Sequence, residues 1–170
     1  MKFKDRPEKN LYYLDFAETA KERSTCCVHF GAIIVKNDQI IATGYNGAPR
    51  GVESCLEKGF CMRRKIGIPS GTRYEFCASV HAEMNAIINS ARAGVSLLGG
   101  DMYIFGEYEG KKITAFPCFI CKRIILNAGL IRVICSDPES PEGFKVCLVK
   151  DWKEKDMIQD PEIYGKNPVK

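Results

Sequence analysis

The sequence of 170 residues lacks any apolar run approaching the roughly 20 residues that a membrane-spanning helix needs. Its first ten residues, MKFKDRPEKN, carry charge with no apolar stretch behind them, so no signal peptide is visible. We therefore expect a cytoplasmic protein with no membrane partner. The net charge of +4 is too small to indicate a polyanionic partner. Histidine is scarce, with two residues against nine cysteines, and it is the cysteines that need explaining.

The composition is that of an ordinary globular chain. Hydrophobic residues make up 45% and charged residues 27%, which excludes a disordered or collagen-like protein. A chain of this length buries roughly 70% of its unfolded surface without disulfide bonds. We expect one domain over residues 1–170, with a core at about 11–150 and a C-terminal tail at about 151–170.

Hydrophobic periodicity predicts the order of the secondary structure. Leu11–Lys21 has the spacing of a helix with one buried face, and two β-rich runs, Val28–Lys36 and Gln39–Tyr45, flank a tight turn. Residues 46–79 have no period, and so long a loop must be held in place. The other expected elements are a helix at 80–93 with Ser79 as N-cap, strands at 101–105 and 131–135, a helix at 118–128 and a less distinct strand at 146–149. This order predicts an α/β sandwich whose later strands are parallel.

Two short motifs contain the residues that point to chemistry. His81-Ala-Glu83 and Pro117-Cys118-x-x-Cys121 each begin an expected helix, where the dipole favours thiolates. One histidine and two thiolates give zinc three ligands and leave a fourth tetrahedral position for water, as in catalytic sites. Either motif alone would be compatible with a core histidine or an incidental CxxC. Together they match the signature of zinc-dependent nucleobase deaminases.

This composition predicts a hydrolytic reaction on a cyclic amidine. Zinc in such a site lowers the pKa of a water molecule towards neutrality. Glu83 would accept a proton from the water and pass protons to the ring nitrogen and to the leaving amine. Ammonia leaves and a keto base remains, so no redox cofactor is needed.

From about Leu14 to Cys135 the chain resembles the deoxycytidylate (dCMP) deaminases of the cytidine deaminase superfamily. The resemblance is carried by ERSTC, GAIIV, ATGYNGAPRG, GIPSG, HAEMNAI, PCxxC and NAG. It implies a three-layer α/β/α sandwich around a mixed sheet of about five strands. It also implies conversion of dCMP to dUMP and ammonia for pyrimidine deoxynucleotide supply, a homo-oligomer such as a dimer or hexamer, and dCTP and dTTP as effectors.

The resemblance also implies substrate contacts. Asn46 would bind the sugar, the backbone at Ala82 and the Phe116 carbonyl would hold the base edge, and Arg92 would contact the nucleotide. The alternative explanation for Asn46 is turn chemistry, and that for Arg92 is the cation preference of a helix C-terminus. The basic residues that are candidates for the phosphate, or simply solvated surface, are Arg50, Arg73 and the run Arg63-Arg64-Lys65.

Four further cysteines match a second zinc site that the resemblance implies. Cys26 and Cys55 fit two of its roles, with Cys61 and Cys77 completing the set. Four thiolates make a closed, structural site that would hold the loop carrying the predicted sugar contact. Four inert thiols are the alternative, and Cys27 could replace Cys26. Cys135 and Cys147 lie in apolar runs and are assigned to the core.

Two segments differ from the family pattern. The link at residues 106–116 is longer than in well-known members and predicts a hairpin or flap at the pocket mouth. The segment SDPESPEGF lacks a tyrosine that some relatives place near the nucleotide. Another cytosine nucleotide, a free heterocycle, or a base in tRNA or single-stranded DNA are therefore alternative substrates. The low charge and GYNG disfavour nucleic acid. A non-catalytic zinc-stabilised binding protein is the third hypothesis, which Glu83 disfavours.

Overall fold

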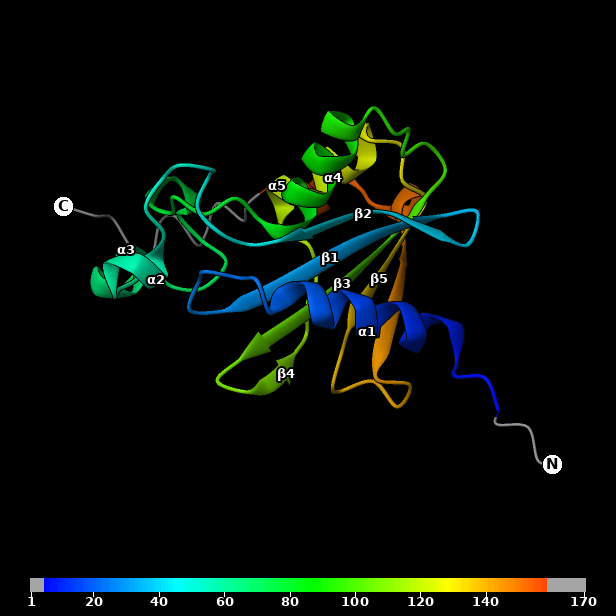
Figure 1. Ribbon diagram of the computed structural model, residues 1–170, viewed down its shortest axis with the longest axis horizontal. Helices are drawn as coiled ribbons and strands as arrows, with labels where there is room; N and C mark the ends of the chain where they lie inside the picture. The colour runs from blue at the N-terminus through cyan, green and yellow to red at the C-terminus, as the bar shows by residue number, and fades with distance from the viewer. Residues whose placement is uncertain (1–4, 159–170) are drawn as a thin grey trace.

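The structure, a computed structural model, describes residues 5–158. It is a mixed sheet between two layers of helices (Figure 1). The strand order is β2-β1-β3-β5-β6, β3 also pairs with the short β4, and β3 and β5 are parallel as predicted. The elements are α1 (Lys9–Lys21), β1 (His29–Lys36), β2 (Gln39–Tyr45), α2 (Cys55–Lys58), α3 (Met62–Lys65), η1 (Tyr74–Phe76), α4 (Ala82–Ala93), β3 (Asp101–Tyr108), β4 (Lys111–Ile113), α5 (Phe119–Asn127), β5 (Arg132–Ser136), β6 (Phe144–Leu148), η2 (Val149–Asp151) and η3 (Glu154–Asp156).

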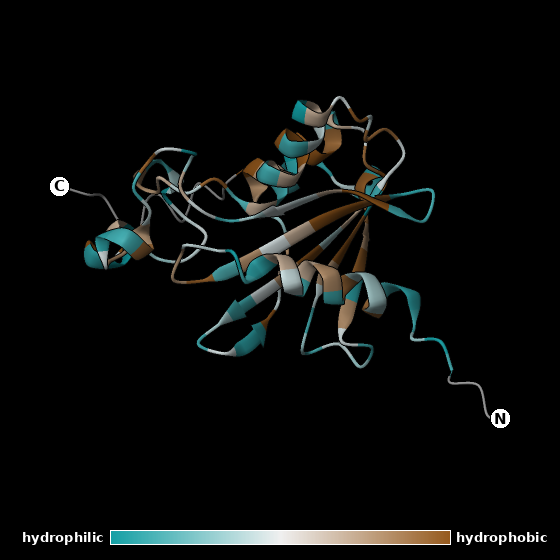
Figure 2. Cartoon of the chain, viewed as in Figure 1, coloured by the Kyte–Doolittle hydropathy of each residue, from teal (hydrophilic) through white to brown (hydrophobic). Residues whose placement is uncertain are grey.

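The central strands are buried on both faces, and their alternation divides the core in two. On β1, Ile34 faces α4 and α5, whereas its neighbours Ile33 and Val35 face α1. On β3, Met102 and Ile104 alternate in the same way with Tyr103 and Phe105. Figure 2 accordingly shows the middle of the sheet as hydrophobic and the connecting turns as hydrophilic. The predicted three-layer α/β/α fold is confirmed.

Glycines set the spacing between the layers on both faces. A Cβ on Gly31 would overlap the backbone of α1 at Ala17, so β1 and α1 touch through their main chains. On the other face, a Cβ on Gly44 of β2 would overlap the carbonyl oxygen of Ala82 and the backbone nitrogen of Ala86 in α4. The first turn of α4 therefore lies directly on β2, and this contact fixes its position on the sheet.

The N-terminus of α4 corrects one prediction. The helix begins at Ala82 with His81 as its N-cap residue, two residues after the predicted start at Val80 with Ser79 as cap. Val80 instead forms an isolated antiparallel β-bridge with Gly47. The Gly47 nitrogen donates to the Val80 oxygen at 3.1 Å, and the Val80 nitrogen donates to the Gly47 oxygen at 2.8 Å. Because this bridge requires extended backbone at Val80, the helix cannot start there.

The irregular segment and the insertion both have defined structure. Residues 46–79 contain the short helices α2, α3 and η1. The insertion forms the predicted hairpin, in which β3 pairs with β4 around Glu109-Gly110, both with positive φ. In the tail, Trp152 packs on the α4–α5 core, and residues 159–170 lie outside the described part. No helix within residues 5–158 is long and apolar enough to cross a membrane.

Candidate active site

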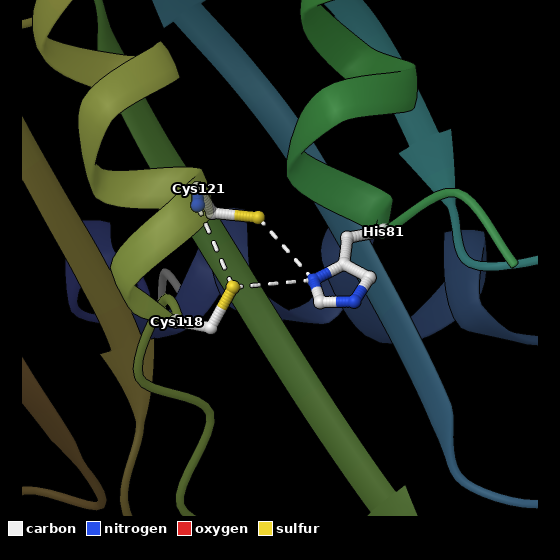
Figure 3. Close-up of side chains that lie close together, drawn as sticks. All are labelled: His81, Cys118 and Cys121. Atoms are coloured by element: carbon white, nitrogen blue, oxygen red, sulfur yellow. Dashed lines mark hydrogen bonds between the residues drawn. The ribbon is translucent and has the colours of Figure 1, made fainter. Parts of the chain in front are cut away.

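The two signature motifs converge because α4 and α5 lie on the same face of the sheet and present their N-termini to each other. His81 caps α4 without using its side chain for the helix, which leaves the imidazole free. On α5, Cys118 is the N-cap residue, and its sulfur accepts a hydrogen bond from the Cys121 nitrogen at 3.5 Å. Figure 3 shows the imidazole facing both sulfur atoms.

The segment before α5 is fixed by the end of β5. The Ala115 nitrogen donates to the Ser136 oxygen at 2.9 Å, and the Ser136 hydroxyl donates to the Ile113 oxygen at 2.9 Å. Thr114 adds a hydrogen bond to Asp137. Pro117 and Cys118 therefore follow a segment that these hydrogen bonds hold to the end of β5, and this places the α5 N-terminus beside that of α4.

The three predicted catalytic ligands form a group that can hold a metal. The ligand atoms of His81, Cys118 and Cys121 all lie within 4.8 Å of one another. The His81 Nδ1 atom lies 3.5 Å from the Cys118 sulfur and 3.3 Å from the Cys121 sulfur. Usual zinc bond lengths at a tetrahedral angle separate a nitrogen from a sulfur ligand by about 3.6 Å. The donor set and its spacing thus fit zinc with one coordination position to spare.

The electrostatics of the group favour metal-binding protonation states at Cys118. A hydrogen bond from Cys121 and another with His81 lower the pKa of Cys118 to about 4 against the opposing effect of burial. The same pairing and burial raise the pKa of Cys121. Burial lowers the pKa of His81, but its interaction with Cys118 and the charge of Glu83 outweigh burial and raise it. The lowered pKa of Cys118 favours its thiolate, the form that binds metal, and binding of a metal would displace the proton of Cys121.

Glu83 lies in the first turn of α4 beside this group. Its side chain is 6% exposed, and burial raises the pKa of its carboxyl group. A buried carboxyl next to an electropositive helix end and an open metal position is placed to accept and return protons. The structure thus places Glu83, the predicted general base, next to the three predicted zinc ligands.

The pocket over this site has a volume of about 670 Å³, within the usual range for small-molecule sites. Its lining includes three of the four predicted substrate-contact residues, Asn46, Ala82 and Phe116. Ala82 lines the pocket although the residue as a whole is buried, so the contact of its backbone with the base stays a prediction. Phe116 is 44% exposed at the rim, where the Lys145 ammonium lies 5.1 Å from its ring.

The side chain of Asn46 is committed mainly to the segment that leads from α1 into β1. Its Oδ1 accepts hydrogen bonds from the Phe30 nitrogen at 2.8 Å and the Ser24 hydroxyl at 2.7 Å, and its Nδ2 donates to Val28 at 2.8 Å. These bonds use both acceptor positions and one of the two amide hydrogens. One N–H is left for a ligand. The structure shows no turn at Asn46, whose side chain instead holds the segment that leads into β1, and the sugar contact stays a prediction.

Arg92 does not line the pocket. It is an exposed residue in the last turn of α4, nine residues from Glu83 and therefore about 13 Å further along the helix axis. The structure shows the helix C-terminal position that was the alternative explanation. A nucleotide contact from Arg92 stays a prediction.

The remaining cysteines of the predicted second site gather on one wall of the same pocket. Its lining includes Cys26, Cys55, Cys61 and Cys77, together with Cys27. Within residues 5–158, these cysteines do not form a group of three ligand atoms as compact as the catalytic one.

The adjacent residues Cys26 and Cys27 make different contacts. The Cys26 sulfur lies 3.0 Å from the Ser79 hydroxyl, whereas the Cys27 thiol interacts with the Cys61 sulfur. Burial raises the pKa of Cys61, but backbone N–H groups of α3 and the Cys27 thiol outweigh burial and lower it. Both Cys26 and Cys27 remain candidate ligands.

Sequence patterns missed several residues that shape the pocket. Tyr74 packs edge-on against His81, with ring centroids 4.9 Å apart, and also contacts Phe119. Tyr108 comes from the inserted hairpin, whereas Arg63 and Arg64 of α3, which also line the pocket, belong to the basic run already considered for the phosphate. The length of the insertion was the one signal for Tyr108, and no motif spacing indicated Tyr74.

Residues 7–137 match the zinc-binding region of cytidine and deoxycytidylate deaminases. The deoxycytidylate deaminase of Mycobacterium phage D29 is 35% identical over 135 residues, covering 76% of this chain and 94% of the relative. The Schizosaccharomyces pombe enzyme of that name is 32% identical over 130 residues, covering 76% of this chain and 37% of the relative. The structure of cyanophage S-TIM5 dCMP deaminase with dCMP and dUMP has a TM-score of 0.54 and 29% identity, covering 76% of this chain and 82% of the other. With the signature motifs converging in one pocket, this chain belongs to the cytidine and deoxycytidylate deaminase family.

Proposed function

We propose that the protein catalyses zinc-dependent hydrolytic deamination of dCMP to dUMP and ammonia, a step that supplies pyrimidine deoxynucleotides. The observation that carries this proposal is the meeting of His81, Cys118 and Cys121 with the buried carboxyl of Glu83 in one pocket. The names of the phage and yeast relatives, and the dCMP and dUMP bound to the cyanophage enzyme, support the choice of substrate.

The chain's own groups account for the proton movements. His81, Cys118 and Cys121 would hold the zinc, which when bound acts as a Lewis acid that lowers the pKa of water. Glu83 accepts one proton of the attacking water and delivers it to the ring nitrogen, then carries the second proton to the leaving amine. The water oxygen becomes the keto oxygen, and ammonia leaves with both electrons of the carbon–nitrogen bond.

The pocket walls would orient the base for this reaction. We assign the backbone at Ala82 and the carbonyl of Phe116 to the base edge, because both residues line the pocket beside Glu83. Tyr74 and Phe119 supply apolar surface that excludes bulk water around the buried carboxyl group.

The test of the function is a substrate panel. We expect zinc-loaded protein to release ammonia from dCMP faster than from CMP, deoxycytidine, dCTP or a cytosine-containing oligonucleotide, as measured by a coupled ammonia assay. Addition of dCTP and dTTP to the dCMP reaction tests the predicted effectors, and sedimentation tests the predicted homo-oligomer. Release from the oligonucleotide alone would contradict the dCMP assignment, and no release from any compound would favour a binding protein.

A second, structural zinc is part of the proposal. We expect two zinc ions per chain by elemental analysis, one in the catalytic group and one on the cysteine wall that contains Cys55 and Cys61. Cys55→Ser should reduce the content to one ion and lower the melting temperature, because the loop at residues 46–79 loses its anchor. Cys147→Ser, at a half-buried cysteine on β6, is the matched control. One zinc per chain in fully loaded wild-type protein would remove the second site.

A further inference from the structure

The charged groups that line the pocket differ in sign and in burial. Among the described lining residues, the carboxylate is that of Glu83 and the cations are Arg63 and Arg64 of α3. Glu83 is buried beside the metal-ligand group, whereas Arg64 is exposed. A ligand whose neutral, hydrogen-bonding ring lies beside Glu83 would therefore also meet guanidinium groups in the lining of the same pocket.

Arg63 stabilises the loop between α3 and η1, which forms part of the pocket wall. Its Nη2 atom donates to the carbonyl oxygens of Pro69, at 2.8 Å, and Thr72. Its guanidinium also lies 5.0 Å from the Tyr74 ring. These contacts hold the loop between α3 and η1 against the pocket. The Arg63 Nε is buried without a hydrogen-bond partner among residues 5–158, so one donor in this wall is unused.

Arg64 is held differently, by the inserted hairpin. Its guanidinium stacks on the Tyr108 ring at 4.7 Å, and its Nη1 donates to the Tyr108 hydroxyl at 3.1 Å. No carboxylate within residues 5–158 forms an ion pair with it. A guanidinium carries five N–H donors, and those not used by Tyr108 remain available. The planar donor edge of arginine matches a phosphate, which it binds with two parallel hydrogen bonds.

We propose that Arg64, positioned by Tyr108, binds the 5′-phosphate of the nucleotide substrate and so makes the protein selective for nucleoside monophosphates. The inference rests on the proposed function, to which it adds two residues and a role for the insertion. A phosphate monoester carries close to two negative charges at pH 7. The hairpin supplies the aromatic face that keeps the guanidinium in one orientation, which reduces the entropy lost on binding.

The test compares Arg64→Gln with Lys65→Gln. Lys65 is the next residue of α3, is also exposed and basic, and contacts Phe60 outside the pocket lining. We expect Arg64→Gln to weaken dUMP binding about 10- to 100-fold by calorimetry and to raise the KM for dCMP similarly, with kcat within about threefold. Lys65→Gln should bind dUMP as the wild type does. Tyr108→Ala should give a smaller rise in KM, partly rescued by Tyr108→Phe, which keeps the stacking.

Other outcomes separate this inference from its rivals. Unchanged dUMP binding by Arg64→Gln would overturn it. Loss of zinc from Arg64→Gln would also overturn it, because Cys27 and Cys61 lie near Arg64 and the arginine would then serve the cysteine wall. If wild-type protein deaminates no cytosine compound but binds dUMP in an Arg64-dependent way, the proposed function fails and the phosphate site stands. If dCMP is deaminated equally by wild type and Arg64→Gln, the inference alone fails.

Discussion

Glu83→Ala and Glu83→Gln are expected to retain catalytic zinc and to lower kcat for dCMP about 10³- to 10⁴-fold. The three ligand atoms come from other residues, so the metal site keeps its donors. What is lost is the carboxyl group that carries two protons in sequence, and a positioned acid–base group contributes effects of this size. Ammonia release gives the rate, and elemental analysis gives the zinc content.

The glutamine variant keeps the size of the buried side chain, so it separates proton transfer from packing. Glu53→Gln removes an exposed carboxyl group from the loop after β2 and should leave the rate unchanged. Turnover by Glu83→Gln at more than about a tenth of the wild-type rate would contradict the role given to this residue. A parallel loss of zinc would show that Glu83 also supports the metal.

Gly44→Ala is expected to lower the free energy of unfolding by about 3 kcal/mol and the deamination rate at least 100-fold. A Cβ at this position overlaps backbone atoms at both Ala82 and Ala86, so α4 itself must move off β2. That movement shifts His81 and Glu83 relative to Cys118 on α5. Misplacement of catalytic groups by about 1 Å costs on the order of 100-fold in rate. Urea unfolding and ammonia release at saturating zinc measure the two effects.

The control for this variant is Thr43→Ala on the same strand. Thr43 is exposed, and its known contact is a backbone one, since its carbonyl accepts from the Asn89 side chain at 2.7 Å. We expect it to change stability by less than about 0.5 kcal/mol. Wild-type stability and rate in Gly44→Ala would show that α4 is not fixed by its contact with β2.

The sequence was most informative where local chemistry decides the structure. The turn at Asn37-Asp38 was predictable because both residues tolerate the positive φ of a two-residue hairpin. The N-terminus of α5 was predictable from Pro117 and the cysteine pair. The meeting of the HxE and PCxxC motifs followed from two crossover helices on one sheet face. These features depend on short segments and on a strongly restricted topology.

Features that depend on distant partners were predicted less well. The start of α4 was wrong because Gly47, more than thirty residues earlier, pairs with Val80. The position of Tyr74 against His81 is set by the packing of an aperiodic loop, which has no sequence signature. The arginine run was ambiguous for a similar reason. The aromatic residues that its arginines contact, Tyr74 and Tyr108, lie in other elements, and only the fold shows which arginine each one contacts.

One ion pair links the inserted hairpin to the opposite layer of the fold. Lys21, at the end of α1 and 3% exposed, pairs with Glu107 at 2.8 Å, and Glu107 directly precedes Tyr108 on β3. Helix α1 has no residue among the described residues that line the pocket. It nevertheless helps to position the end of β3, which carries Tyr108. We therefore expect substitution of Lys21 to affect the affinity for a nucleotide through Tyr108, with the predicted zinc ligands and Glu83 unchanged.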